Sequence, residues 1–161
     1  MSDMNKTEPS AVNSVGVTGV NSAPVARVGA LLAEAAAHYR EALRSTPKAV
    51  AYLRRRGVSG AAAARFGLGF ASPGWHGLEP VLCQYDAETV SASGLQVVKT
   101  NDASRCFDRF RDRIMFPIRA RSGAVVGFGG RVLDGTQPKY MNSPETEGFK
   151  KRTLLYGLFE A

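Results

Sequence analysis

The chain has 161 residues, of which 44% are hydrophobic and 22% are charged, and its formal net charge at pH 7 is +7. These values are typical of one soluble globular domain with a hydrophobic core. No segment approaches the ~18 apolar residues of a membrane span, and the N-terminus lacks the basic and apolar regions of a signal peptide. We therefore expect a cytoplasmic protein without a membrane partner.

Positive charge is concentrated in residues 99–152, which carry twelve Lys or Arg and six Asp or Glu. This third of the chain holds six of the seven net positive charges. A one-sided field of this kind attracts polyanions, and contacts to their phosphates make binding sensitive to salt. A solvated basic face kept for solubility is the alternative.

The two cysteines, Cys83 and Cys106, have no cysteine or histidine neighbour at the spacing of a metal site. Nothing marks the chain as secreted. The sequence therefore predicts neither a zinc site nor a disulfide.

The N-terminal segment, residues 1–23, is rich in small and polar residues and lacks helical periodicity. It predicts a flexible tail or linker ahead of one domain over residues 24–161. Apolar residues then recur with helical spacing, which predicts an amphipathic helix over residues 27–44. Its apolar face is formed by Val28, Leu31, Leu32, Ala35, Ala36, Tyr39, Ala42 and Leu43.

Short helices are predicted next. Thr46 and Pro47 fit the N-cap and the first position of a second helix, which Gly57 ends. Ser59 is the predicted cap of a third helix over residues 60–66. Two further helices are expected, one near residues 77–85 and one that Asp86 opens and Gly94 ends.

Beyond Gly94 the periodicity changes from helical spacing to alternation. Residues 114–118 read as a strand, residues 124–133 as the strand that returns after a Ser-Gly turn, and residues 138–142 as a short extended piece. Apolar residues at 154–158 predict a last strand or helix. The fold class is therefore α+β, with a helical N-terminal half packed against a small mixed or antiparallel β-sheet.

Side chains around these strands are suited to contacts with phosphates. Arg109 and Arg111 precede the first strand, and Arg131 follows the glycines of Gly127–Arg131, a pattern that marks a close approach of backbone or ligand. Tight packing of the strand against a helix is the alternative for the glycines. A phosphate loop is excluded, because the pattern G-x-x-x-x-G-K-[ST] is absent.

The segment after the second strand adds further candidates. Lys139 follows Pro138, which fixes the local backbone and thereby the direction of the lysine. Tyr140 is the aromatic residue best suited to stack on a base, and Asn142 adds a neutral hydrogen-bonding group. Lys151 lies in a second basic cluster, for which a solvated face is the alternative.

The acidic residues do not form a cluster of the kind that holds Mg²⁺ in a nucleotidyl transferase. Asp108 and Asp112 are flanked by arginines, which predicts salt bridges. Glu145 is assigned a structural role, with one of the arginines as its partner. We therefore expect no catalytic residue and no metal ligand in this chain.

Motifs over about residues 27–161 resemble, in order, the catalytic core of DnaG-type bacterial DNA primases. They are YLRRRG at 52–57, FGLGF at 66–70, Gly94-Leu95, DRFRDRIMFPI at 108–118, GFGGR at 127–131, PKYMNSPET at 138–146, Phe149 with Lys151, and LYGL at 155–158. The resemblance implies the N-terminal basic half of an RNA-polymerase core. By the same resemblance, Arg56, Arg131, Lys139 and Lys151 line a groove for template and nucleotide.

The family's enzymes synthesise RNA primers for DNA replication and consist of a zinc-binding domain, the core and a helicase-binding domain. The Toprim half of the core carries the metal-binding acids. Neither the zinc-binding part nor the Toprim part is in this sequence, so the resemblance implies a polypeptide that is inactive alone, with Mg²⁺ bound by the Toprim part of the complete enzyme. The implied partners are single-stranded DNA template, ribonucleotides, and either the replicative helicase or a Toprim-bearing chain.

Two alternatives to a primase subdomain stay open. The first is a stand-alone, non-catalytic module that binds nucleic acid or docks onto a primase or helicase through the helix at 27–44. The second is an inert remnant with an exposed apolar segment at 154–159, for which aggregation would be the sign.

Overall fold

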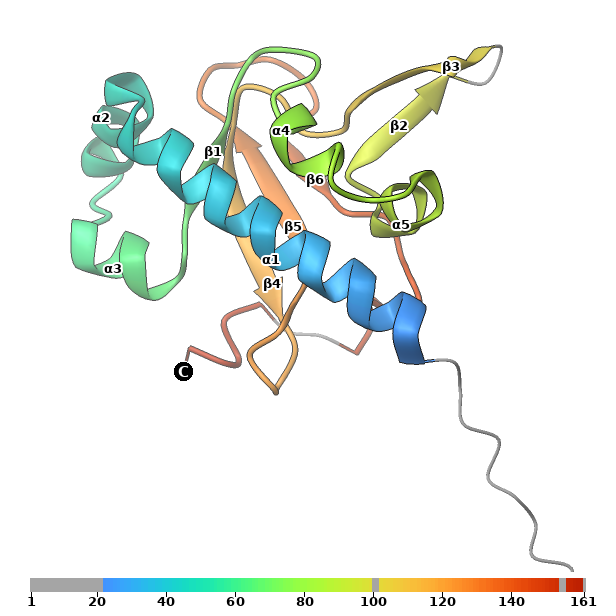
Figure 1. The fold of residues 1–161 in the computed structure, drawn as a ribbon. Helices are drawn as coiled ribbons and strands as arrows, with labels where there is room; N and C mark the ends of the chain where they lie inside the picture. Colours follow the sequence, from blue (N-terminus) through green and yellow to red (C-terminus); the bar gives the residue numbers. More distant parts are fainter. Residues whose placement is uncertain (1–21, 100–101, 154–155, 161) are drawn as a thin grey trace, which may run out of the picture.

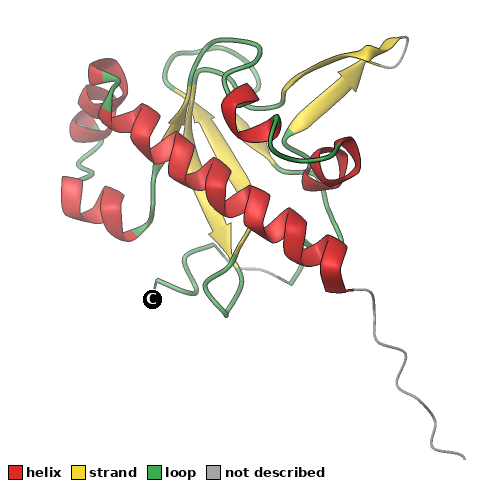
Figure 2. Cartoon of the chain, in the orientation of Figure 1, coloured by secondary structure: helices red, strands yellow, loops and turns green. Residues whose placement is uncertain are grey.

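The computed structural model describes residues 22–99, 102–153 and 156–160 (Figure 1). One long helix, α1 (Ser22–Arg44), crosses the face of a four-stranded antiparallel sheet, and short helices lie beside it (Figure 2). The predicted α+β class is therefore confirmed. The predicted tail, as far as residue 21, lies outside the described residues.

Helix α1 begins at Ser22, five residues before the predicted start. The reason is that Pro24 falls in the first turn, where a helix needs no backbone N–H donor, so proline does not delay the helix. The predicted apolar face packs on the sheet, and Leu31 and Tyr39 on it are no more than 3% exposed. Packing against the sheet thus occupies the face that the docking alternative would need.

The capping signals placed the next two helices correctly. Helix α2 (Pro47–Arg55) is followed by Gly57, whose φ of +78° suits glycine, and Ser59 caps α3 (Gly60–Arg65) by accepting a hydrogen bond from the Ala62 N–H over 3.1 Å. Thr46 is the N-cap of α2, as predicted, but its side chain makes no capping hydrogen bond. The Thr46 hydroxyl instead donates to the Ala42 carbonyl over 2.7 Å, which joins the start of α2 to the end of α1.

The helix predicted near 77–85 is shorter than expected, since α4 covers only Glu79–Leu82. The backbone N–H groups of Gln84 and Tyr85 bond to carbonyls three residues back, so the chain turns instead of continuing the helix. Helix α5 (Ala87–Ser93) follows as predicted, with the Asp86 carboxylate accepting from the Thr89 N–H over 2.8 Å.

The main sheet has the strand order β1-β4-β5-β6, and every pair is antiparallel. Strands β4 (Arg113–Arg119), β5 (Val125–Val132) and β6 (Tyr140–Asn142) match the three predicted extended segments. Strand β1 (Gly69–Ala71) was not predicted, because it is only three residues long and wholly buried, so no alternation marks it.

A separate hairpin of β2 (Gln96–Lys99) and β3 (Asp102–Asp108) projects beside α5 (Figure 1). The predicted apolar element near the C-terminus is not seen at residues 156–160, which form turns, and residues 154–155 lie outside the described part. The ring centres of Tyr156 and Phe66 lie 6.3 Å apart, and Tyr156 is exposed.

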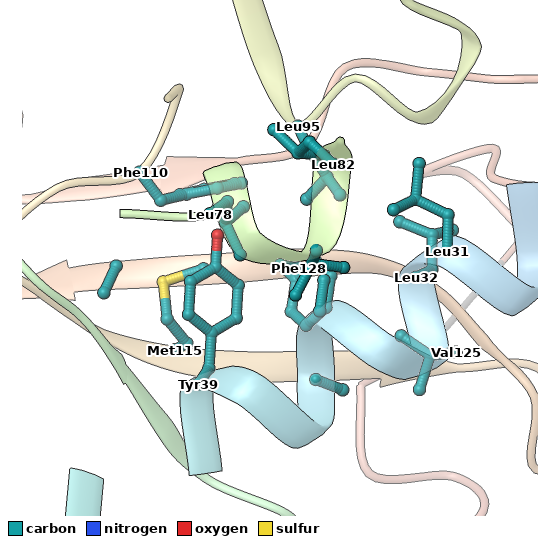
Figure 3. Close-up of a cluster of buried hydrophobic side chains, with 14 residues drawn as sticks. Leu31, Leu32, Tyr39, Leu78, Leu82, Leu95, Phe110, Met115, Val125 and Phe128 are labelled. Atoms are coloured by element: carbon teal, nitrogen blue, oxygen red, sulfur yellow. The ribbon is translucent and has the colours of Figure 1, made fainter. Parts of the chain in front are cut away.

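The core lies between α1 and the sheet (Figure 3). Tyr39 of α1 meets Phe128 of β5 edge to face, with ring centroids 5.4 Å apart. Full burial of each large apolar side chain contributes about 2 kcal/mol to folding. Gly69 allows the close contact between α1 and β1, because a Cβ there would lie 2.5 Å from the Cβ of Tyr39. This packing fixes β5, whose C-terminal end carries Arg131.

Candidate nucleic-acid interface

A hollow of about 450 Å³ lies between α2, the C-terminal end of β5 and the loop that follows it. We call it the basic pocket. Its lining consists of Tyr52, Arg56, Arg131, Val132, Leu133, Asp134, Gly135, Gln137 and Lys139. Three of the predicted phosphate-binding residues thus surround one space: Arg131 and Lys139 from neighbouring segments, and Arg56 from a segment far away in the sequence.

Arg131 is the best-placed donor in the basic pocket. It faces Tyr140 across the β5–β6 ladder, with its guanidinium carbon 5.2 Å from the centre of the tyrosine ring. Its Nε is buried and makes no hydrogen bond to the described residues. A buried donor without a partner costs free energy, which an acceptor brought by a ligand would offset.

Tyr140 is flanked by a second cation. The Lys139 Nζ lies 5.8 Å from the centre of the same ring, and the side chain of Tyr140 is 61% exposed. No ion pair joins Arg56, Arg131 or Lys139 to an acidic residue within the described ranges. An exposed aromatic ring between unpaired cations suits a base with its phosphates.

One acidic residue, Asp134, lines the basic pocket as well. Hydrogen bonds from the Thr136 hydroxyl and N–H lower the pKa of the Asp134 carboxyl below its ordinary value, so it stays ionised at neutral pH. Three cations against this one carboxylate leave the basic pocket with a positive balance.

Arg113 positions the loop that carries Lys139. It is 5% exposed, and its guanidinium donates to the Pro138 carbonyl over 2.7 Å. Burial lowers the pKa of Arg113 below its ordinary value. The Val132 N–H also donates to the Lys139 carbonyl over 3.2 Å. The backbone at Lys139 is therefore held from two sides, although sequence patterns gave Arg113 no separate role.

A second hollow, of about 290 Å³, contains Arg109 and Arg111 and shares Val132, Asp134 and Gln137 with the basic pocket. The Arg109 Nε donates to the Gly94 carbonyl over 2.7 Å, and burial lowers the pKa of Arg109. Arg111 donates to the Asp108 carbonyl over 3.0 Å. Both guanidinium groups bond to neutral backbone oxygens, which leave the positive charge available to a polyanion.

Trp75 is a functional candidate that the sequence patterns did not reveal. Arg111 lies over its indole ring, 3.8 Å from the ring centre, and Phe107 meets the same ring edge to face at 5.3 Å. Even so, Trp75 is 57% exposed. The signal available was a single tryptophan in a Pro-Gly loop, where an apolar core position is not expected.

Asn142 and Lys151 line neither hollow. Asn142 lies on β6 opposite Gly129 and is exposed. Lys151 is exposed too, and its backbone N–H donates to the Glu145 carboxylate over 3.2 Å. The acceptor role of Glu145 is structural, but its partner is this backbone N–H and not one of the arginines.

The two aspartates of the arginine-rich segment behave differently. Asp112 forms a salt bridge, at 3.0 Å to Lys48, whereas Asp108 forms no salt bridge with any residue that the structure describes. The Asp108 carboxylate is buried and accepts from the Leu78 N–H over 2.8 Å. Burial raises its pKa above the ordinary value.

Within the described residues, no three His, Cys, Asp or Glu side chains are grouped in a way that could hold a metal ion. The same part of the chain contains no helix both long and apolar enough to cross a bilayer. The described residues around the two hollows thus offer cationic and aromatic contacts.

Comparison with known proteins identifies the family of the domain that carries this interface. Residues 38–161 match the family model of the DNA primase catalytic core, N-terminal domain. A DNA primase from Pseudomonas putida is 49% identical over 139 residues, which cover 81% of this chain and 20% of the relative. The chain therefore spans about a fifth of the length of that curated relative.

Solved structures agree with the sequence match. A DnaG primase catalytic domain bound to single-stranded DNA aligns with a TM-score of 0.79 at 39% identity, over 87% of this chain and 44% of that one. The RNA polymerase domain of Mycobacterium tuberculosis DnaG, in complex with double-stranded DNA that has a 6-nucleotide overhang, aligns with a TM-score of 0.74 at 40% identity, over 82% and 42%.

Proposed function

Because the chain belongs to the DnaG family of DNA primases and corresponds to part of the catalytic core, we propose that it holds the single-stranded template and the phosphates of an incoming ribonucleotide. The observation that carries the proposal is the Arg131 side chain, with its buried and unpartnered Nε beside the exposed ring of Tyr140. The DNA-bound relatives support a nucleic-acid ligand for this surface.

In the proposed arrangement, phosphates bind to the three cations of the basic pocket, and bases stack on exposed aromatic rings. Arg131 supplies a directed N–H donor, and Lys139 and Arg56 supply charge. Tyr140 and Trp75 supply the stacking faces. Arg109 and Arg111 extend the positive potential past the loop into the second hollow.

Primer synthesis is proposed for the complete enzyme, because the chain spans only a fifth of its relative. The residues described here do not fit a metal site. The Mg²⁺ expected for the family is therefore not assigned to this chain, and no step of the proposal runs through it. The remaining parts of the enzyme, or a separate Toprim-bearing chain, would supply the chemistry, and the replicative helicase is a further proposed partner.

The test is binding of a labelled single-stranded DNA, followed by fluorescence anisotropy over a range of salt concentrations. Arg131→Ala should weaken binding and reduce the slope of log K against log salt by about 0.7, the value for one phosphate contact on a single strand. The matched control is Arg121→Ala, because Arg121 is exposed in the turn between β4 and β5 and lines neither hollow. Equal losses in the two variants would show that only net charge matters and would overturn the assignment.

A further inference from the structure

A third hollow, of about 210 Å³, lies at the corner formed by the C-terminal half of α1, α2 and α3, at the left of Figure 1. We call it the helical groove. Its apolar lining includes Leu43, Val50, Leu53, Val58, Ala63 and Leu68. Three arginines, Arg40, Arg44 and Arg54, line it as well.

The helical groove and the basic pocket have no lining residue in common and lie against different faces of α2 and its C-cap. Leu53 and Arg54 line the groove, whereas Tyr52 and Arg56 line the basic pocket. On a helix with 3.6 residues per turn, residues two apart lie about 160° from each other around the axis, so Arg54 points away from both Tyr52 and Arg56. The groove is therefore outside the surface proposed for nucleic acid.

Two of the three arginines of the groove have no partner for their charge. Arg40 and Arg54 are exposed, and across the described segments neither side chain makes an ion pair or a hydrogen bond. Arg44 bonds to Glu41 over 3.3 Å, but that pair is largely exposed and contributes little. No acidic residue lines the groove.

An apolar floor with an arginine rim selects for one kind of occupant. The hollow of about 210 Å³ has room for an apolar side chain, and its aliphatic lining offers no aromatic ring on which a base could stack. The rim is complementary to carboxylates on either side of such an anchor. We propose that the helical groove binds an acidic amphipathic segment of a partner protein, with an apolar anchor between α2 and α3 and carboxylates on Arg40 and Arg54.

The probe for this proposal is a fluorescent helical peptide of about 14 residues, made of Glu, Ala and Leu, with the leucines on one face. An isomer with the same composition and its leucines spread around the helix controls for charge. The wild-type chain should bind the first peptide at least about tenfold more tightly than the isomer. Backbone amide shifts in NMR spectra should change at Leu53 and Ala63.

Two substitutions test the groove from different sides. Arg54→Glu reverses one rim charge, and Ala64→Leu fills the groove at a position that is itself exposed, so that folding is maintained. Each substitution should weaken binding of the first peptide by about tenfold or more. Arg121→Glu makes the same charge change elsewhere and should leave that affinity unchanged. Single-stranded DNA should bind the Ala64→Leu variant as it binds the wild type.

Three outcomes would overturn the proposal. The first is equal binding of the two peptides, and the second is equal weakening by Arg54→Glu and Arg121→Glu, which would indicate attraction to net charge alone. The third is displacement of the peptide by single-stranded DNA together with a loss of DNA affinity in Ala64→Leu, which would make the groove part of the nucleic-acid surface. None of these outcomes depends on Arg131, so failure here is distinguishable from failure of the proposed template site.

Discussion

Arg113 donates from its guanidinium to the carbonyl of Pro138 over 2.7 Å, which ties the first residue of β4 to the loop in front of Lys139. The donor is charged and buried. The acceptor belongs to Pro138, which directly precedes Lys139, a proposed phosphate contact. Loop geometry, and with it the shape of the basic pocket, therefore depends on a residue that does not line that pocket.

Arg113→Ala should both release the loop and destabilise the fold. Loss of a buried, charge-assisted hydrogen bond costs about 1.5–3 kcal/mol of unfolding free energy, and DNA affinity should fall as Lys139 loses its fixed position. Urea denaturation and anisotropy measure the two effects. Arg113→Lys retains the charge and should recover more of the stability than of the affinity. A variant with full DNA affinity would show that the loop holds its shape without this bond.

Trp75→Ala should weaken binding of single-stranded DNA, because stacking on an aromatic ring contributes about 1–3 kcal/mol per base. Trp75→Phe keeps a stacking face and should retain most of the affinity. The chain has one tryptophan, so its fluorescence reports on this position alone. We expect quenching of the wild-type signal on titration with DNA. An unchanged spectrum at saturation would exclude Trp75 from the contact surface.

Tyr39→Phe should raise the free energy of unfolding by about 1 kcal/mol, the lower end of the cost of an unsatisfied buried polar group. The hydroxyl of Tyr39 is buried and makes no hydrogen bond within the described part of the chain, and burial together with the nearby Asp108 raises its pKa well above the ordinary value. Tyr39→Leu is the control, because it also removes the ring that meets Phe128, and it should destabilise. Equal destabilisation by both variants would mean that the hydroxyl has a partner in solution.

Titration of Asp108 should lower the free energy of unfolding as pH rises. Burial raises its folded-state pKa above the ordinary value of 3.8, so the folded chain binds the proton more tightly than the unfolded chain does. The stabilisation is complete below the unfolded pKa and is lost as pH rises through the folded pKa. Asp108→Asn removes this titration, so the stability of the wild type relative to that variant should decline from about pH 4 towards neutral pH in urea denaturation. A difference that is constant with pH, or one that grows, would contradict the assignment.

Local signals predicted the parts of the fold that local chemistry decides. Ser59 and Asp86 accept the capping hydrogen bonds expected of them, and the alternation in β4 and β5 gave their positions to within one residue. Thr46 occupies the predicted N-cap position, but its hydroxyl donates to the Ala42 carbonyl at the end of α1 and makes no capping hydrogen bond. Strand β1 was missed because its existence depends on partners at Arg113–Met115, more than forty residues away.

The candidate site was predictable in composition but not in grouping. Cationic residues near glycines indicated phosphate contacts, and Arg131, Lys139 and Arg56 do line one hollow. Sequence spacing could not show that Asn142 and Lys151 stand outside both hollows, nor that Trp75 is covered by Arg111 on one face. Those relationships arise only when the loop at 72–77, the hairpin and the main sheet are packed together.

The strand order of the main sheet has a consequence for solution behaviour. Its two edges are β1 and β6, each three residues long, while the strands of seven and eight residues lie between them. A sheet recruits further strands through free N–H and C=O groups along its rim, and short rims offer too few of these groups to template growth. The edge strands β1 and β6 of the main sheet therefore offer few backbone groups for pairing with a second copy of that sheet, even at the concentrations that binding experiments require.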